Sequence, residues 1–448
     1  MILIIEILDR ILVILMALIS HLEKSPIRRV HIEILIINSL AYALTAMNVM
    51  IIAPLLTSIQ TELGIESTVI LGVVISSTYF GMLVGAFSFG RLSDLFGRKK
   101  VLALGLAIHG IFTALTGLAY DALSLAIIRF IAGIGLGGSL PIPGVYMSEY
   151  PPAKYRGTFV GLVETSWVWG AILSLVISRL VLPLSNWRTV LFFGLGVLLV
   201  IPLVLLFLPE SIRYLEIKGK EDEAIDILRK YGIIGEDETI EITKAPKETY
   251  SWKIFFSRKY LQRTLIIIAL WMVLNYTYHG IFIWLPKTYA RMGYSEIKSI
   301  EWTIYITLAQ IPGYYSAAFL LDKIGRKKVL SIYLFGAAIG CAVILTFPAD
   351  LNMIFVGSII VSFFNLGAWS AVYTYTPELY PTELRGTFSG LGASFGRIAA
   401  IIAQPITGFL FGAGGALFPF FAFLIVHLIG AFTSMLGPET KGKTLEEI

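Results

Sequence analysis

Long apolar runs separated by short polar turns make up most of the chain after about residue 32. Most runs are about 20 residues long, which as α-helix is enough to cross a hydrocarbon core of about 30 Å. They lack the alternating pattern of a barrel strand, so helices are the predicted elements. We predict about twelve membrane spans, at residues 32–59, 69–90, 101–120, 122–145, 158–181, 188–208, 264–290, 299–321, 329–348, 351–374, 387–412 and 416–436.

The composition agrees with this pattern. Of the 448 residues, 56% are hydrophobic and 15% are charged, whereas soluble domains carry roughly 25% charge. The predicted fold class is an all-α, polytopic membrane protein. Lysine and arginine gather in the turns on one side of the predicted spans, so the positive-inside rule predicts that both termini are cytoplasmic. The same bias explains the net charge of +5 without a nucleic-acid partner.

The residues that usually hold metals or cofactors form no recognisable site. Cys341 lies inside a predicted span, and the five histidines are scattered without the spacing of metal ligands. Residues 133–138 match the letters of a dinucleotide-binding turn, but they lie inside an apolar run and follow no strand. We therefore expect helix packing there, and neither a metal nor a cofactor.

A charged turn occurs twice along the chain. Asp94 is followed three residues later by Gly97 and then by Arg98. About 228 residues further on, Asp322 is followed in the same way by Gly325 and Arg326. Each turn lies between two predicted spans. The repetition indicates that the protein consists of two similar halves.

The repeat extends to other charged residues at the cytoplasmic ends of the spans. Glu149 and Arg156 return as Glu378 and Arg385, and Glu210 returns as Glu439. Together with the two turns, these positions predict a gating network whose ion pairs lock the halves together and separate when the inside opens. The alternative is that these side chains only anchor loops to lipid headgroups. The predicted network comprises Asp94, Arg98, Glu149, Arg156, Glu210, Asp322, Arg326, Glu378, Arg385 and Glu439.

The spans and turns suggest five parts. We expect a cytoplasmic amphipathic segment at 1–29, for which an extra span is the alternative. Two six-helix bundles follow at 30–208 and 264–437. Between them lies a cytoplasmic linker at 209–263, with a short helix at 221–231, and the chain ends in a cytoplasmic tail at 438–448.

These motifs resemble the major facilitator superfamily. The two charged turns are similar to the signature loop of this superfamily. Two other segments are similar to its sugar-porter branch: Pro209-Glu-Ser-Ile-Arg-Tyr-Leu215 and the segment from Pro438-Glu-Thr to Glu447. Four other segments are more similar to a neighbouring branch that includes nicotinate and aromatic-acid symporters and synaptic-vesicle-protein-like transporters: 137–141, 164–167, 279–286 and 375–381. The resemblance implies two six-helix bundles around a central cavity, alternating access driven by a gradient, and a monomer in the lipid bilayer.

Charged residues within spans are the sharpest candidates for function. Arg397 lies about 16 Å into its helix, and its fixed charge suits a carboxylate, with a structural ion pair as the alternative. Glu164 lies about 10 Å from the cytoplasmic face and is a candidate proton site, unless it only balances a nearby base. Relatives often have an Asp where this chain has Asn48, so simple proton symport through that position is in doubt. The resemblance places Arg129 near Asn48, where we expect a role in coupling or in locking helices together, with substrate contact as the alternative.

Aromatic and amide side chains in several spans suit a cavity for a small ring-bearing molecule. Ordinary helix packing is the alternative for each one. The expected substrate-binding residues, besides Arg397, are Asn48, Trp167, Asn275, His279, Gln310, Asn365 and Trp369.

We expect a secondary active transporter of a small organic solute, an organic or aromatic carboxylate, in a prokaryotic cytoplasmic membrane. Proton coupling stays open because Asn48 cannot titrate. A sugar transporter is the alternative within this class, and a membrane sensor that does not transport its ligand is the alternative outside it. An enzyme is not expected, because no nucleophile–base set or phosphate-binding loop is found.

Overall fold

The computed structural model describes residues 21–235, 254, 257–380 and 384–442, and its regular elements there are all helices. Twelve helices or helix pairs in this part are long and apolar enough to cross a membrane, which confirms the predicted number. Some run past their predicted ends. The fourth continues to Glu149 and the tenth to Glu378, because a helix can extend its polar end beyond the hydrocarbon.

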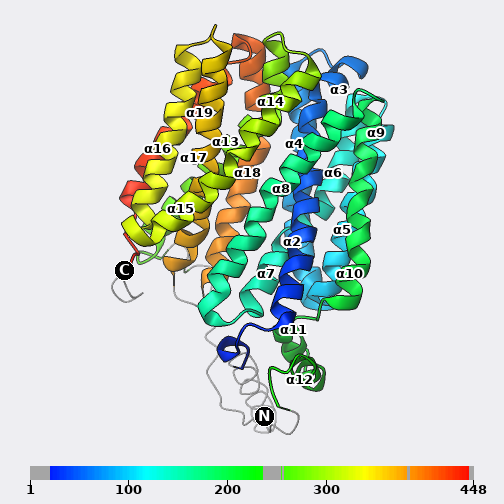
Figure 1. Ribbon diagram of the computed structural model, residues 1–448, viewed down its shortest axis with the longest axis vertical. Coiled ribbons are helices and arrows are strands. Elements are labelled where there is room, and N and C mark those ends of the chain that lie inside the picture. The colour runs from blue at the N-terminus through cyan, green and yellow to red at the C-terminus, as the bar shows by residue number, and fades with distance from the viewer. Residues whose placement is uncertain (1–20, 236–253, 255–256, 381–383, 443–448) are drawn as a thin grey trace.

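The first half of the chain forms six spans and is drawn from blue to green in Figure 1. Short 3-10 segments join helices within the first and sixth spans. The helices are α2 (Arg29–Met50), α3 (Leu56–Glu62), α4 (Thr68–Phe96), α5 (Arg98–Leu115), α6 (Ala122–Ser139), α7 (Pro141–Glu149), α8 (Arg156–Val181), α9 (Trp187–Phe192) and α10 (Val200–Phe207).

The second half also forms six spans and lies beside the first (Figure 1). Its eighth span is a pair of helices, α14 and α15. The helices are α13 (Leu261–Arg291), α14 (Glu296–Leu308), α15 (Gln310–Ile324), α16 (Arg326–Thr346), α17 (Leu351–Glu378), α18 (Arg385–Gly414) and α19 (Pro419–Leu436).

Two short helices, α11 (Ile212–Ile217) and α12 (Glu221–Lys230), lie between the halves in sequence and extend below the first half in Figure 1. α12 matches the short helix expected in the linker to within one residue. Of the predicted N-terminal segment, residues 1–20 lie outside the described part of the chain. We call the end of the molecule that carries both charged turns, α11 and α12 the charged end, and the opposite end the far end.

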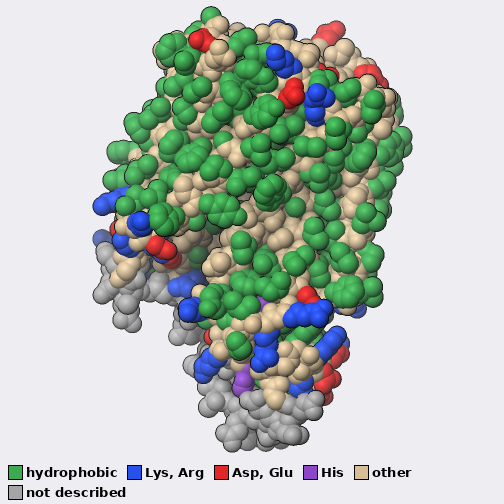
Figure 2. Space-filling view, in the orientation of Figure 1, with side chains coloured by type: hydrophobic (Ala, Val, Ile, Leu, Met, Phe, Trp, Pro, Cys, Tyr) green, Lys and Arg blue, Asp and Glu red, His purple; other side chains and the backbone are tan. Residues whose placement is uncertain are grey.

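The surface agrees with a membrane setting. Figure 2 shows hydrophobic side chains covering the flank of the molecule, with acidic and basic side chains gathered toward its two ends. An apolar flank of this height can face lipid, whereas charged ends face water.

The glycines at the two charged turns have an identical role. Gly97 and Gly325 have φ angles of 97° and 96°, a region that side-chain-bearing residues rarely adopt. Each glycine ends one span and begins the next, α4 to α5 and α15 to α16. The sequence repeat is therefore also a repeat of backbone conformation.

The glycine-rich run in α6 packs against α4. A Cβ added to Gly133 would overlap the backbone carbonyl of Thr78, and one added to Gly137 would overlap that of Met82. These glycines let the two backbones approach closely, as small residues do between membrane helices. The expectation of helix packing, rather than a dinucleotide site, agrees with this contact.

Candidate functional site

A cavity of about 390 Å³ lies between the two halves. The halves are joined at the far end, where the Thr68 hydroxyl donates to the Gly408 carbonyl at 2.7 Å. The Ser58 hydroxyl lies 2.7 and 2.8 Å from the two oxygens of Glu296 in the same region. Closer to the charged end, Phe87 on α4 lines the cavity. The cavity is thus sealed from the far end.

The cavity walls are mainly aromatic. The Trp271 ring meets Trp369 edge-on at 5.7 Å and Tyr373 edge-on at 5.3 Å between centroids. Edge-to-face contacts of this kind fix ring orientation. An apolar wall with a few placed polar groups is typical of small-molecule sites. The aromatic residues that line the cavity are Tyr42, Tyr79, Phe87, Trp167, Trp271, Tyr278, Tyr314, Trp369 and Tyr373.

Two hydrogen bonds between the halves involve rings that line the cavity. The Tyr79 hydroxyl lies 2.9 Å from Nδ1 of His279, and the indole N–H of Trp167 donates to the Tyr278 hydroxyl at 2.7 Å. Tyr79 and Trp167 belong to the first half, whereas Tyr278 and His279 belong to α13. These contacts must break if the halves separate on this side.

Arg397 on α18 faces this cavity. Its guanidinium forms no ion pair or hydrogen bond with any described residue, and the ionisable groups that influence it most are the hydroxyls of Tyr373 and Tyr42. The alternative of a structural ion pair with an acid on another helix is therefore not observed. A permanent cation in a largely apolar cavity leaves its hydrogen-bond donors available to an anion.

Glu164 on α8 also lines the cavity and belongs to the other half. The Tyr42 hydroxyl donates to its Oε2 at 2.6 Å, and Tyr373, which lines the same cavity, also acts on the carboxylate. Within the described chain, no lysine or arginine lies within ion-pair distance of Glu164, so the alternative of a carboxylate that balances a nearby base is not observed. Glu164 and Arg397 thus face one cavity without pairing with each other.

Asn275 is the one expected amide that lines the cavity. Its Nδ2 donates to the Trp271 carbonyl at 2.9 Å. Of the other expected substrate-binding residues, Trp167, His279 and Trp369 line the cavity as well.

Three expected substrate-binding residues do not line the cavity, so their role in binding stays a prediction. Asn48 is fully buried, with Nδ2 3.0 Å from His109 and 3.1 Å from the Gly194 carbonyl. Gln310 is also fully buried and accepts a 3.4 Å hydrogen bond from Tyr278. Asn365 is buried beside Thr277, to which its Nδ2 donates at 2.9 Å. Each amide has a hydrogen-bond partner on a neighbouring helix, which sequence alone cannot distinguish from a ligand contact.

Arg129 lies beside Asn48, as the resemblance implied, but it does not line the cavity. Its Nε donates to the Thr78 hydroxyl at 3.0 Å, and both terminal nitrogens lie 3.4 Å from the Asn48 carbonyl oxygen. The side chain is 1% exposed. Its described partners are neutral oxygens that link α6 to α2 and α4.

Sequence reasoning missed several tyrosines of the cavity, and Tyr42 is the most important of them. It lies four residues after Asn38 and three before Thr45, so these three polar residues share one face of α2. That spacing was a usable signal. For Tyr79 and Tyr314 the sequence holds no comparable sign.

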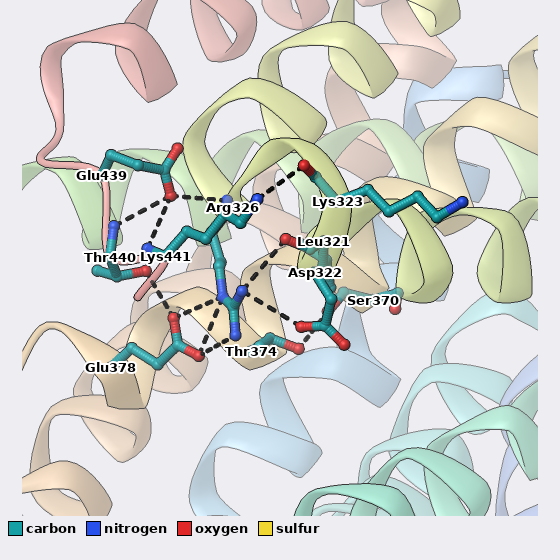
Figure 3. Close-up of polar contacts among 10 residues, drawn as sticks. All are labelled: Leu321, Asp322, Lys323, Arg326, Ser370, Thr374, Glu378, Glu439, Thr440 and Lys441. Carbon is teal, nitrogen blue, oxygen red and sulfur yellow. Dashed lines mark hydrogen bonds and ion pairs between the residues drawn. The ribbon is translucent and has the colours of Figure 1, made fainter. Parts of the chain in front are cut away.

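In the second half, the predicted gating residues form one cluster around Arg326 (Figure 3). The guanidinium lies 3.3 Å from Asp322 and makes contacts of 2.9 to 3.1 Å with both oxygens of Glu378. Glu439 accepts from the backbone N–H of Arg326 at 2.8 Å and so caps the first turn of α16. Thr440 donates to Glu378 at 2.6 Å.

The first half repeats this cluster with one difference. Arg98 pairs with Asp94 at 3.0 Å, and Glu210 accepts from the backbone N–H of Arg98 at 2.8 Å. Glu149 accepts from the Ser211 hydroxyl at 2.5 Å, as Glu378 accepts from Thr440. However, Nε of Arg98 has no hydrogen-bond partner, whereas the matching atom of Arg326 contacts Glu378. The first cluster is therefore less completely paired.

Arg156 and Arg385 lie outside these clusters. Arg156 pairs with Glu23 at 2.9 Å, and Nε of Arg385 donates to the Tyr380 carbonyl at 3.2 Å. Every ion pair that the described gating residues form lies within one half. A lock between the halves would belong to another conformation, and it stays a prediction.

The comparisons with known proteins bear on the whole of this architecture. A family model described as "Sugar (and other) transporter" matches residues 34–448. The chain belongs to this family of the major facilitator superfamily. The protein is therefore a multi-pass membrane transporter and not an enzyme, and its two bundles and central cavity are the working parts of a transporter.

Individual relatives agree with the family. The chain is 35% identical to the niacin transporter NiaP of Acinetobacter baylyi, over 97% of this chain and all of the relative. It is 25% identical to the benzoate transport protein of the same species, over 87% of this chain and 85% of the relative. Among solved structures, the xylose transporter XylE of E. coli in a partially occluded inward-open conformation shares the fold, with a TM-score of 0.75. That likeness has 20% sequence identity and covers 93% of this chain and 99% of the other.

Proposed function

We propose that this transporter carries a small aromatic carboxylate, with nicotinate as the first candidate, together with a proton across the cytoplasmic membrane. The observation that carries the proposal is Arg397, a guanidinium without a described acidic partner in an aromatic cavity. A guanidinium binds a carboxylate through two parallel hydrogen bonds, which fixes the position and orientation of the anion. The names of the niacin and benzoate relatives favour a ring-bearing acid.

The aromatic wall suits the ring of such a substrate. The rings of Trp271, Trp369 and Tyr373 form one edge-to-face group in the cavity wall. These three residues belong to the second half of the chain, as Arg397 does. A carboxylate bound at Arg397 would place the substrate's ring against these aromatic side chains, where the rings pack together and exclude water. A volume of about 390 Å³ is at the lower end of the range for small-molecule sites, which favours a single-ring solute.

Glu164 supports coupling to a proton. The cavity is lined by one acid, Glu164, and one permanent cation, Arg397, so with Glu164 ionised the empty cavity has no net charge. A bound carboxylate together with a protonated Glu164 again gives no net charge, whereas either ligand alone leaves one uncompensated charge. An unbalanced charge is costly in a closed, low-dielectric cavity. The transporter should therefore change between its inward-facing and outward-facing conformations most readily when it is empty or fully loaded. One proton per carboxylate follows from this balance.

A sugar is the weaker candidate. Sugar binding relies on several amides directed into the cavity, but Gln310 and Asn365 are buried away from it, and Asn275 is the one amide among the described lining residues. The orientation is also part of the proposal: the charged end, rich in lysine and arginine, would face the cytoplasm. A sensor that binds without transport would show no flux in the assay below.

The test is uptake of labelled nicotinate into proteoliposomes, with and without an inward proton gradient. We expect gradient-driven accumulation, inhibition by benzoate, and little inhibition by nicotinamide or xylose, which lack the carboxylate. Arg397→Ala should weaken nicotinate binding by at least about 30-fold, the effect of removing one partner of a desolvated charge pair. Arg291→Ala, an exposed arginine at the end of α13, is the matched control and should behave as wild type. Equal uptake of nicotinate and nicotinamide, or normal uptake by Arg397→Ala, would contradict the proposal.

A further inference from the structure

We propose that the hydroxyls of Tyr42 and Tyr373 connect Glu164 to the anion site at Arg397, so that each ligand alters the affinity for the other. This inference rests on the proposed function above. It adds the residues through which proton and substrate sense one another, which neither the family nor the named relatives assign.

The geometry places four polar side chains around one cavity. Tyr42 on α2 donates to Glu164 at 2.6 Å. The Tyr373 side chain on α17 lines the cavity and acts on Glu164, and Arg397 is the cation that acts on Tyr373. Four helices contribute one residue each, two from either half. All four side chains line the same cavity.

Neighbouring aromatic side chains hold the rings of Tyr42 and Tyr373 in place, so mainly their hydroxyl groups are free to reorient. The Tyr373 ring lies against Trp271 at 5.3 Å and Trp369 at 5.5 Å. The Tyr42 ring meets Trp167 edge-on at 6.2 Å, and its side chain is 6% exposed. Rings packed in this way place a hydroxyl at a defined point. The hydroxyl hydrogen can still rotate between acceptors.

The coupling follows from the single proton on each hydroxyl. With the cavity empty, Tyr42 and Tyr373 can both donate to an ionised Glu164. A carboxylate held by Arg397 offers Tyr373 a second, charged acceptor. If the Tyr373 hydroxyl donates to the substrate instead, the ionised form of Glu164 loses one hydrogen-bond donor. Glu164 therefore binds its proton more tightly when the substrate is present. A hydrogen bond to a charged group is worth roughly a tenfold to hundredfold change in affinity, and linkage requires the effect to be equal in both directions.

The path also explains why Glu164 and Arg397 do not simply pair. A direct ion pair would compete with both ligands, and each would have to break it before binding. In the proposed path, the two tyrosines are neutral, polar groups that can stabilise both charges. Coupling can then pass through a change in hydrogen-bond direction instead of the breaking of a salt bridge.

The experiment removes each hydroxyl and keeps its ring. We would measure nicotinate affinity of purified protein by tryptophan fluorescence from pH 5 to pH 8, and gradient-driven accumulation in proteoliposomes, for wild type, Tyr373→Phe and Tyr42→Phe. Wild type should bind nicotinate more weakly as the pH rises. Tyr373→Phe should lose most of that pH dependence. Relative to wild type, its gradient-driven accumulation should fall at least tenfold more than its counterflow without a gradient. Tyr276→Phe, a tyrosine of α13 that packs against Phe423 outside the cavity lining, is the control.

The outcomes separate this inference from the proposed function. A wild-type symporter whose Tyr373→Phe and Tyr42→Phe variants keep the full pH dependence and full accumulation overturns the inference alone. A wild-type protein that neither binds nor transports any carboxylate overturns the proposed function and the inference with it. Because two independent variants test the same path, a folding defect in one leaves the other to decide.

Discussion

Glu216 is a buried carboxyl group with no partner, and it gives the sharpest prediction about pH. It lies in α11, is 1% exposed, and neither of its carboxyl oxygens has a hydrogen-bond partner. Burial, together with the nearby acids Glu149 and Glu221, raises its pKa from 4.5 to about 8, against the opposing effect of Arg213. The docked α11 therefore keeps Glu216 protonated at neutral pH.

The direction of the pH effect follows from linkage. When α11 undocks, Glu216 meets water and returns to an ordinary pKa near 4.5. Between that value and about 8, the undocked form has released its proton and the docked form has not, so rising pH favours undocking. At pH 7 this amounts to about 3 kcal/mol relative to acidic solution, from 1.36 kcal/mol per pH unit. Below about pH 4.5 and above about pH 8 the dependence should level off.

The perturbation is Glu216→Gln, which keeps the shape of the side chain and removes its charge. We expect this variant to protect α11 and α12 from hydrogen exchange about as well as wild type at pH 5, and clearly better at pH 8. Hydrogen–deuterium exchange of residues 212–230, corrected for the intrinsic pH dependence of exchange, measures this. Glu223→Gln is the control, because Glu223 is exposed on α12 and pairs only with Lys220.

The result that refutes the reasoning is a difference between wild type and Glu216→Gln that stays constant from pH 5 to pH 8. Such a result would mean that Glu216 is ionised and hydrated in the docked state. A variant that loses protection at pH 5 would instead show that the amide does not fit where the neutral carboxyl does.

Further outcomes are expected at the charged turns and in the helix packing. Asp94→Asn and Asp322→Asn each remove an ion pair within one half. We expect each change to shift the balance between inward and outward conformations, measured with a distance reporter, while ligand affinity within one state stays unchanged. An unshifted reporter would contradict a gating role. Gly170→Ala should lower the free energy of unfolding by about 1–3 kcal/mol, because its Cβ would overlap the backbone carbonyl of Ala43. A Cβ on Gly161 would meet the Tyr314 hydroxyl at an ordinary 3.8 Å, so Gly161→Ala should not lower it. Equal melting temperatures for the two glycine variants would count against tight packing of α8 on α2.

The fold could be predicted from the sequence because lipid leaves the backbone few choices. A run of about 20 apolar residues must form a helix to satisfy its own hydrogen bonds, and the charged turns at Gly97 and Gly325 mark the ends of neighbouring spans. The ends of the helices were less predictable. Polar residues such as Glu149 and Glu378 extend a helix into water without any change in hydrophobicity to announce the end.

The site was only partly predictable, and the reason is the same for each expected residue that lies outside the cavity. A polar side chain in a span needs a partner, but the sequence does not say whether that partner is a ligand or another helix. Asn48, Gln310 and Asn365 found partners among neighbouring helices. Glu164 and Arg397 found none of opposite charge, and this fact became visible only when every helix was in place.

The two halves differ exactly where the chemistry is proposed to occur, and that contrast is itself an argument about function. Shared structure at the charged turns repeats residue by residue, because both halves must bend and pack alike. At the repeat's offset of about 229 residues, however, Glu164 corresponds to Ala393, and Arg397 corresponds to Val168. A structural ion pair within the repeat would be expected to return in the second half, as Arg98–Asp94 returns as Arg326–Asp322. The acid and the base of the cavity each occur once, in different halves, so only the assembled interface brings both to one substrate.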